Sequence, residues 1–178
     1  MPPVIRQFDA KGDLVLILSG EGTPNGCHFQ VSSKHLMLAS PGATQVPLPE
    51  DNAEALSIIL DIVHTKTRDV ETKLNWSTLM EIAILVDKYE LLSAVGIFAD
   101  LWFDNLNFNA SQFEQFTEEG EESVYEAISM SWVFRRANEF REITKIAIID
   151  SKKRLEDAMD LTLPHSIVGK SFIHVSQI

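Results

Sequence analysis

The chain has 178 residues, of which 45% are hydrophobic, and 26 acidic against 15 basic residues give it a net charge of −11. This length and apolar content predict one domain, or one domain with an appended subdomain, and exclude wholesale disorder. Direct binding of nucleic acid requires a concentrated positive face, and neither half of the chain supplies one.

Membrane insertion, secretion and disulfide bonding are not expected either. The longest apolar runs, such as 14–18, are far too short to span a bilayer, and no apolar core follows a basic start at the N-terminus. The single cysteine, Cys27, can form neither an internal disulfide nor a zinc framework. We therefore expect a soluble intracellular protein, cytoplasmic or nuclear, with no membrane partner.

Two apolar stretches near the N-terminus predict strands of a small sheet. The stretch 4–8 alternates only loosely, and turn residues at 9–13 separate it from the next apolar run, which predicts a hairpin over 4–18. Its second half, 14–18, is an unbroken apolar run of the kind found in strands that are covered on both faces.

A glycine-rich stretch at 20–26 follows this run. A phosphate-binding loop would lead into a helix and carry a lysine, whereas here the strand-like segment 27–31 follows. Asn25 and Gly26 can also adopt the positive φ angles of a tight turn. The stretch therefore predicts a hairpin loop.

A helix is expected to begin at Ser32 or Ser33, both candidate N-caps, and to run to about Ser40, because the residue before Pro41 is pushed out of helical geometry. Three consecutive apolar residues, 36–38, must face different directions on this helix. One side can cover the sheet, and the surplus suits a partner. We favour a self-association interface over core packing alone.

The next stretch predicts a short extended piece at 46–49 and a second helix from Asp51 to about His64. Asp51 and Glu54 have the spacing of a capping box, and apolar residues recur at helical intervals behind them. The polar stretch 65–72 can hold at most a short edge strand.

Two further helices are expected before residue 107. One follows a second capping-box pattern, Thr78 and Glu81, and runs to about Tyr89. The other, at 91–106, has too many large apolar residues for a free surface helix, so it is packed on both sides or lies in an interface.

The acidic, polar stretch 107–123 is the best candidate for a boundary in the chain. Helical spacing returns after it and is broken at Leu163-Pro164. We therefore predict a domain at 1–106, an acidic linker at 107–123 and a helical C-terminal extension at 124–178.

With this order of elements in hand, the residues resemble the BTB/POZ family, in the divergent form common in fungal proteins. The similarity covers about 12–106, and six pieces in the right order carry it: Asp13–Ile17, His28–Ser32, Lys34–Pro41, Val46–Asp51, Ala55–Leu60 with Val63-His64, and Val86–Tyr89. The segment Ser129–Phe134 is also similar to the helical extension that follows the domain in such proteins.

The resemblance implies an α+β fold in which a small β-sheet is packed with a cluster of α-helices and followed by an all-helical extension. It also implies a non-catalytic interaction module without a cofactor, which pairs with itself as a homodimer and scaffolds other proteins. Family members commonly pair through the first helix and the N-terminal strand. The corresponding interface residues here are Val4, Ile5, Phe8, His35, Leu36, Met37 and Leu38.

Many animal members instead hold a cullin as substrate adaptors of a ubiquitin ligase, which is the alternative function. Cullin-binding members place contacts in a stretch after the Ser-Pro that is shortened here, since only four residues separate Pro41 from Val46. Either the gap is natural or a segment is missing from the sequence.

No pattern in the chain predicts catalytic or metal chemistry. Cys27 and His28 are adjacent in a predicted strand and point to opposite faces, so they cannot act together. The five histidines have no metal-ligand spacing. Arg135 and Arg136, among glutamates, predict surface ion pairs rather than a phosphate site.

Overall fold

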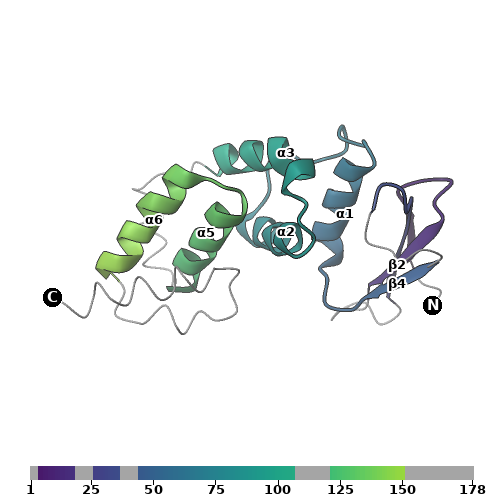
Figure 1. The fold of residues 1–178 in the computed structure, drawn as a ribbon, viewed down its shortest axis with the longest axis horizontal. Helices are drawn as coiled ribbons and strands as arrows, with labels where there is room; N and C mark the ends of the chain where they lie inside the picture. Colours follow the sequence, from purple (N-terminus) through teal and green to yellow (C-terminus); the bar gives the residue numbers. More distant parts are fainter. Residues whose placement is uncertain (1–3, 19–25, 37–43, 107–120, 151–178) are drawn as a thin grey trace. The chain divides into compact units, whose positions relative to one another are not determined.

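The computed structural model describes residues 4–18, 26–36, 44–106 and 121–150, and within them it has four strands and five helices (Figure 1). The predicted α+β class is therefore confirmed. The chain divides into two compact units, Met1–Val95 and Gly96–Ile178, and the division falls within a helix. None of the described helices is long and apolar enough to cross a membrane.

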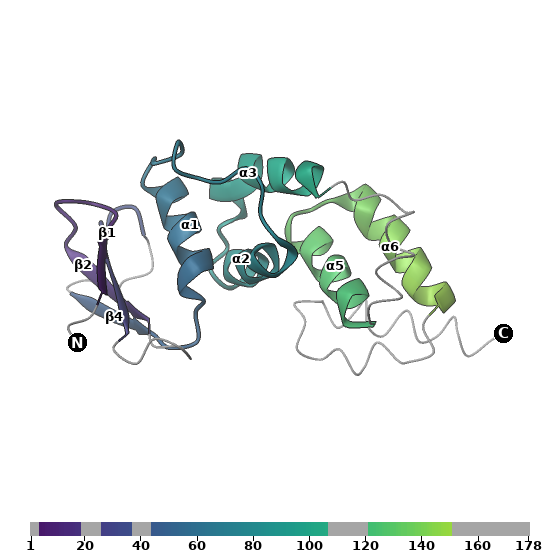
Figure 2. The same cartoon turned by 180° about the vertical axis from the view of Figure 1, so that it is seen from behind.

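The first unit contains a four-stranded sheet in the order β1-β3-β2-β4. Three of its strands, β1, β2 and β4, are labelled in Figure 2. Its strands are β1 (Val4–Gln7), β2 (Leu14–Leu18), β3 (Cys27–Val31) and β4 (Gln45–Leu48). The hairpin predicted between 14–18 and 27–31 is confirmed, since β2 and β3 are antiparallel with Leu16 opposite Phe29. Gly26 before β3 has a φ of 70°, as a tight turn requires.

The hairpin predicted over 4–18 is wrong. β1 lies parallel to β3, with Ile5 opposite His28, because β3 and β4 occupy the two edges of β2. The burial of β2 also differs from the prediction: Leu14, Leu16 and Leu18 are buried, while the residues between them are only half-buried. One face of this strand therefore carries the core, as the alternation of side chains along a strand dictates.

Three helices follow the sheet: α1 (Ala53–Val63), α2 (Trp76–Lys88) and α3 (Leu92–Asn105). Leucines and isoleucines at helical spacing on α1 and α2 are buried, and the two helices pack together in the first unit (Figure 1). The largest fully buried side chains of this unit are Leu14, Leu16, Leu18, Ile59, Leu60, Leu79, Ile82 and Leu85.

Both predicted capping boxes are wrong, the first by one residue and the second by three. The side chain of Asn52 caps α1 by accepting the N–H of Ala55 at 3.0 Å, and that of Asn75 caps α2 by accepting the N–H of Thr78 at 2.8 Å. Asp51 is buried and accepts hydrogen bonds from Lys88 Nζ and the Tyr89 hydroxyl instead.

The second unit contains the part of α3 from Gly96 onward, α5 (Glu121–Val133) and α6 (Ala137–Asp150). Trp102 and Phe103 of α3 are buried, and the ring of Phe103 meets that of Phe134 edge-on at 5.6 Å. Of the predicted acidic linker, 107–120 lies outside the described residues, and residues 121–123 already belong to α5.

Candidate protein-interaction site

The seven predicted interface residues lie in β1, immediately after it, and in the segment that follows β3. Val4 and Ile5 are in β1, where Ile5 is 63% exposed. His35 is exposed. Phe8 and Leu36 are buried within the chain, so they can support an interface from behind but offer it little surface. Met37 and Leu38 lie outside the described residues.

The segment after β3 begins as a turn. The N–H of His35 bonds the carbonyl of Ser32 at 3.1 Å, and the N–H of Leu36 bonds that of Ser33 at 3.2 Å. These are i to i+3 bonds, so residues 32–36 form a turn where the sequence predicts the first turn of a helix. The remainder of that predicted helix lies outside the described residues.

The structure brings β1 and this turn together around His64, at the C-terminal end of α1. The ring of His64 lies 6.0 Å from that of Phe8 and 5.0 Å from that of His35. Phe8 also meets the ring of Phe29 edge-on at 5.2 Å. Residues from β1, β3, the turn and α1 therefore share one cluster, although they are far apart in the sequence.

Both ring nitrogens of the buried His64 are engaged. Its Nε2 accepts the backbone N–H of Ser32 at 3.2 Å, and its Nδ1 lies 2.9 Å from the carbonyl oxygen of Leu60. Since Nδ1 must donate and Nε2 must accept, this geometry fits the neutral imidazole. Burial lowers the pKa of His64, although the bond to Leu60 acts in the opposite direction.

Asp13, the residue before β2, holds Ser33 of the turn. Its carboxylate accepts the N–H of Ser33 at 2.8 Å and the Ser33 hydroxyl at 2.7 Å. These bonds lower the pKa of Asp13, because they favour the charged form. His64 and Asp13 thus fix consecutive residues of the turn that leads toward the predicted interface.

β1 is fastened to α1 by Arg6. Its guanidinium bonds Asp61 and the Ser57 hydroxyl, each at 2.6 Å, and lies 4.8 Å from the centre of the Phe8 ring. Burial raises the pKa of Asp61, and the opposing effect of Arg6 is smaller. Arg6 and Asp61 carried no prediction, because the sequence gives no sign that β1 and α1 are neighbours.

The two edges of the sheet differ in what they can bind. Within the described residues, β1 has a neighbouring strand on one side only, so its other edge can pair with an added strand. β4 forms the opposite edge and contains Pro47, which has no N–H to donate. The β1 edge, with Ile5 exposed, is thus the better candidate for a partner.

The remaining predictions concern single residues. Cys27 is half-buried, and burial raises the pKa of its thiol, which suits a structural residue better than a reactive one. Across residues 4–18, 26–36, 44–106 and 121–150, no three His, Cys, Asp or Glu side chains are grouped closely enough to hold a metal ion. Comparison with protein-family models, curated proteins and solved structures found no match.

Proposed function

We propose that this chain is a non-catalytic protein-interaction module of the BTB/POZ type, which forms a homodimer and scaffolds partner proteins. The observation that carries the proposal is the β1 edge, which no other described strand covers, where Ile5 is 63% exposed and the neighbouring turn is fixed by His64 and Asp13. A rigid, partly apolar surface suits association, because little conformational entropy is lost when it binds.

The topology of the first unit also supports the proposal. An antiparallel strand pair, a further strand parallel to the first of that pair, and then successive helices fit part of the order of elements on which the resemblance rests. The helix expected between the strands is a turn at 32–36, and its remainder lies outside the described residues. In the proposed dimer, two copies bury the same surface around a two-fold axis, with Ile5 and His35 in contact and Phe8 and Leu36 packed behind them.

Light scattering of the whole chain tests the proposal, and a dimer is the expected result. The variant Ile5→Glu should weaken the dimer at least about tenfold, since it places a charge where an isoleucine would be buried. The matched control is Ile84→Glu, at an exposed isoleucine of α2, which should remain dimeric. A monomer at high concentration would refute self-association.

The alternative function, a substrate adaptor that binds a cullin, requires a separate experiment. Pull-down with the N-terminal region of a cullin should give weak or no binding, because the link between Pro41 and Val46 is short. If the chain instead binds the cullin fragment firmly while it remains a dimer, the ubiquitin-ligase adaptor would be the better description of its function. Of this link, 41–43 lies outside the described residues.

A further inference from the structure

The outer side of α3 carries apolar residues that the described parts of the chain leave exposed. Val95, Ala99, Trp102 and Phe103 form the buried side of this helix. Ile97 is nevertheless 79% exposed and Leu101 is 42% exposed. Four residues apart, these two side chains are neighbours on the helix surface. The sequence predicts either packing on both sides or an interface for this helix, and the exposed pair favours the interface.

Two carboxylates lie on the same side of the helix. Asp100 and Asp104 follow Ile97 by three and seven residues, which places them beside the exposed pair. Their side chains are 65% and 70% exposed. The outer face of α3, which we define as Gly96, Ile97, Asp100, Leu101 and Asp104, is therefore apolar along one row and acidic along the next.

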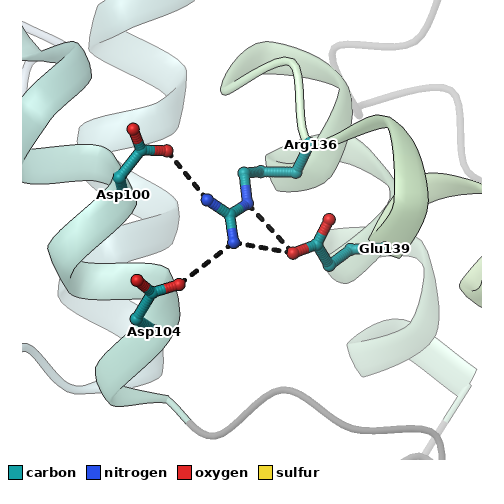
Figure 3. Close-up of polar contacts among 4 residues, drawn as sticks. All are labelled: Asp100, Asp104, Arg136 and Glu139. Carbon is teal, nitrogen blue, oxygen red and sulfur yellow. Dashed lines mark hydrogen bonds and ion pairs between the residues drawn. The ribbon is translucent and has the colours of Figure 1, made fainter.

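Within the described part of the chain, the acidic row is only partly neutralised. Arg136, the residue before α6, contacts Asp100 at 2.8 Å, Asp104 at 3.1 Å and Glu139 at 2.7 Å (Figure 3). Three carboxylates thus share one guanidinium, which leaves two negative charges without a counter-charge in this group. Both aspartates bond Arg136 through Oδ1, so their Oδ2 atoms can accept a further donor.

The backbone beside this row is accessible. A Cβ atom built on Gly96 would meet none of the described residues within 4 Å, so they leave space over this part of the helix. A partner helix can approach the backbone closely at such a position, while Ile97 and Leu101 contact its apolar side chains.

These charges also decide what kind of partner fits. A second copy of the same face would bring aspartates against aspartates, and like charges at an interface oppose association. We propose that the outer face of α3 docks an amphipathic helix of a different protein, which presents aliphatic side chains flanked by Lys or Arg. This surface is separate from the β1 edge proposed for self-association.

The probe for this proposal is a synthetic helical peptide with Leu at positions four apart and Lys beside them. A second peptide has the same composition, but some of its Leu and Lys residues have changed places. Lysines therefore interrupt its apolar row. We expect fluorescence polarisation with the whole chain to show the first peptide binding at least about tenfold more tightly than the second, because only the first buries the apolar pair.

Matched variants locate the binding. The double variant Ile97→Ser with Leu101→Ser should weaken the first peptide at least about tenfold, while Ile84→Ser on α2 should leave it unchanged. Binding through general negative charge alone would leave the double variant unaffected and would overturn the proposal. The variant Ile5→Glu should retain the peptide, which separates this surface from the dimer.

Arg136→Gln tests the electrostatic part, since among the described residues Arg136 is the cation that contacts Asp100 and Asp104. It should tighten the lysine peptide several-fold and steepen its dependence on salt, whereas a purely structural role for Arg136 predicts no tightening. If the double variant instead converts a dimer of the chain to monomer without any peptide, the occupant is a second copy and the proposal is wrong.

Discussion

The surroundings of His64 and of Arg136 show two ways in which this chain joins distant segments through a basic side chain. His64 is buried, neutral and bonded to backbone groups of the β3 turn and of α1. Arg136 is charged and joins α6 to exposed carboxylates of α3 (Figure 3). The first arrangement is sensitive to protonation and to the loss of volume, and the second is sensitive to salt.

The difference between the two sites follows from desolvation. A buried imidazole avoids the cost of a buried charge by remaining neutral, and its two bonds then satisfy groups that water cannot reach. A guanidinium remains protonated, and ion pairs of exposed carboxylates are weakened by solvent and ions. Each site therefore predicts its own response to mutation, pH and salt.

Removal of the imidazole should have the largest effect. His64→Ala leaves the Ser32 N–H and the Leu60 carbonyl without their partner and opens a cavity beside Phe8. We expect the free energy of unfolding to fall by about 2–4 kcal/mol. Urea denaturation measures it, with His35→Ala, at the exposed neighbouring histidine, as the control. An equal loss of stability in both variants would contradict the assigned role of His64 in bonding Ser32 and Leu60.

The sequence predicts the strands and helices of this fold better than it predicts which strands pair with one another. The strands at 14–18 and 27–31 and the helix 51–64 follow from apolar runs and helical spacing, which are local properties. The N-caps Asn52 and Asn75 were missed, because nearby Asp51 and Thr78 offered competing patterns. The pairing of β1 with β3 cannot be read from local patterns, since it depends on which edges of β2 are already occupied.

The residues of the two sites were predictable to different degrees. Ion pairs of Arg136 were expected, and the structure confirms them, but Asp100 and Asp104 lie 36 and 32 residues away in the sequence. The sequence places His64 at the end of a helix but predicts no bonding partner for it, since its bond to Ser32 spans 32 residues. A polar residue at the end of an apolar helix gives no sign of a distant partner. Ile5 is placed in the predicted interface by the family resemblance alone, because the loose alternation of 4–8 does not indicate which side is exposed.

Loss of the guanidinium should be the next largest effect. Arg136→Met keeps much of the side-chain length but removes the contacts to Asp100, Asp104 and Glu139. We expect a loss of about 1–2 kcal/mol at low salt, smaller than for His64→Ala because the aspartates are exposed to solvent. Urea denaturation at low and high salt should show this loss shrinking as salt rises. A loss independent of salt would contradict the assigned mechanism.

The pH dependence separates the two sites directly. Burial lowers the pKa of His64 below its ordinary value of 6.5, so the unfolded chain binds a proton before the folded one does. This contribution to stability is complete above pH 6.5 and is lost as the pH falls from there toward the folded pKa. The slope is at most about 1.4 kcal/mol per pH unit. Arg136 stays charged throughout and contributes none.

Unfolding by urea at about pH 7.5 and about pH 5.5 measures this effect, and the variant His64→Gln should remove it. The charged neighbours Asp9 and Lys66, and the ring of His35, remain in that variant. Asp61 also remains, and its effect on stability is opposite to that of His64. Because the pKa of Asp61 is raised, stability increases as the pH falls through the pKa of Asp61 in the folded state. An unchanged pH response in His64→Gln would assign the effect to these neighbours.

The smallest expected change is a gain in stability. It tests whether there is space for a side chain at Gly96 on the outer face of α3, in contrast to Gly26 in the first unit. Gly96→Ala should stabilise the chain by about 0.5–1 kcal/mol, because alanine favours a helix and its Cβ meets nothing within 4 Å. Gly26→Ala is the matched contrast. Gly26 has a positive φ, and a Cβ there would lie 3.1 Å from the Leu18 carbonyl oxygen, so the same substitution should destabilise. Thermal melting of both variants compares them, and a loss at Gly96 would mean that this face is already covered in solution.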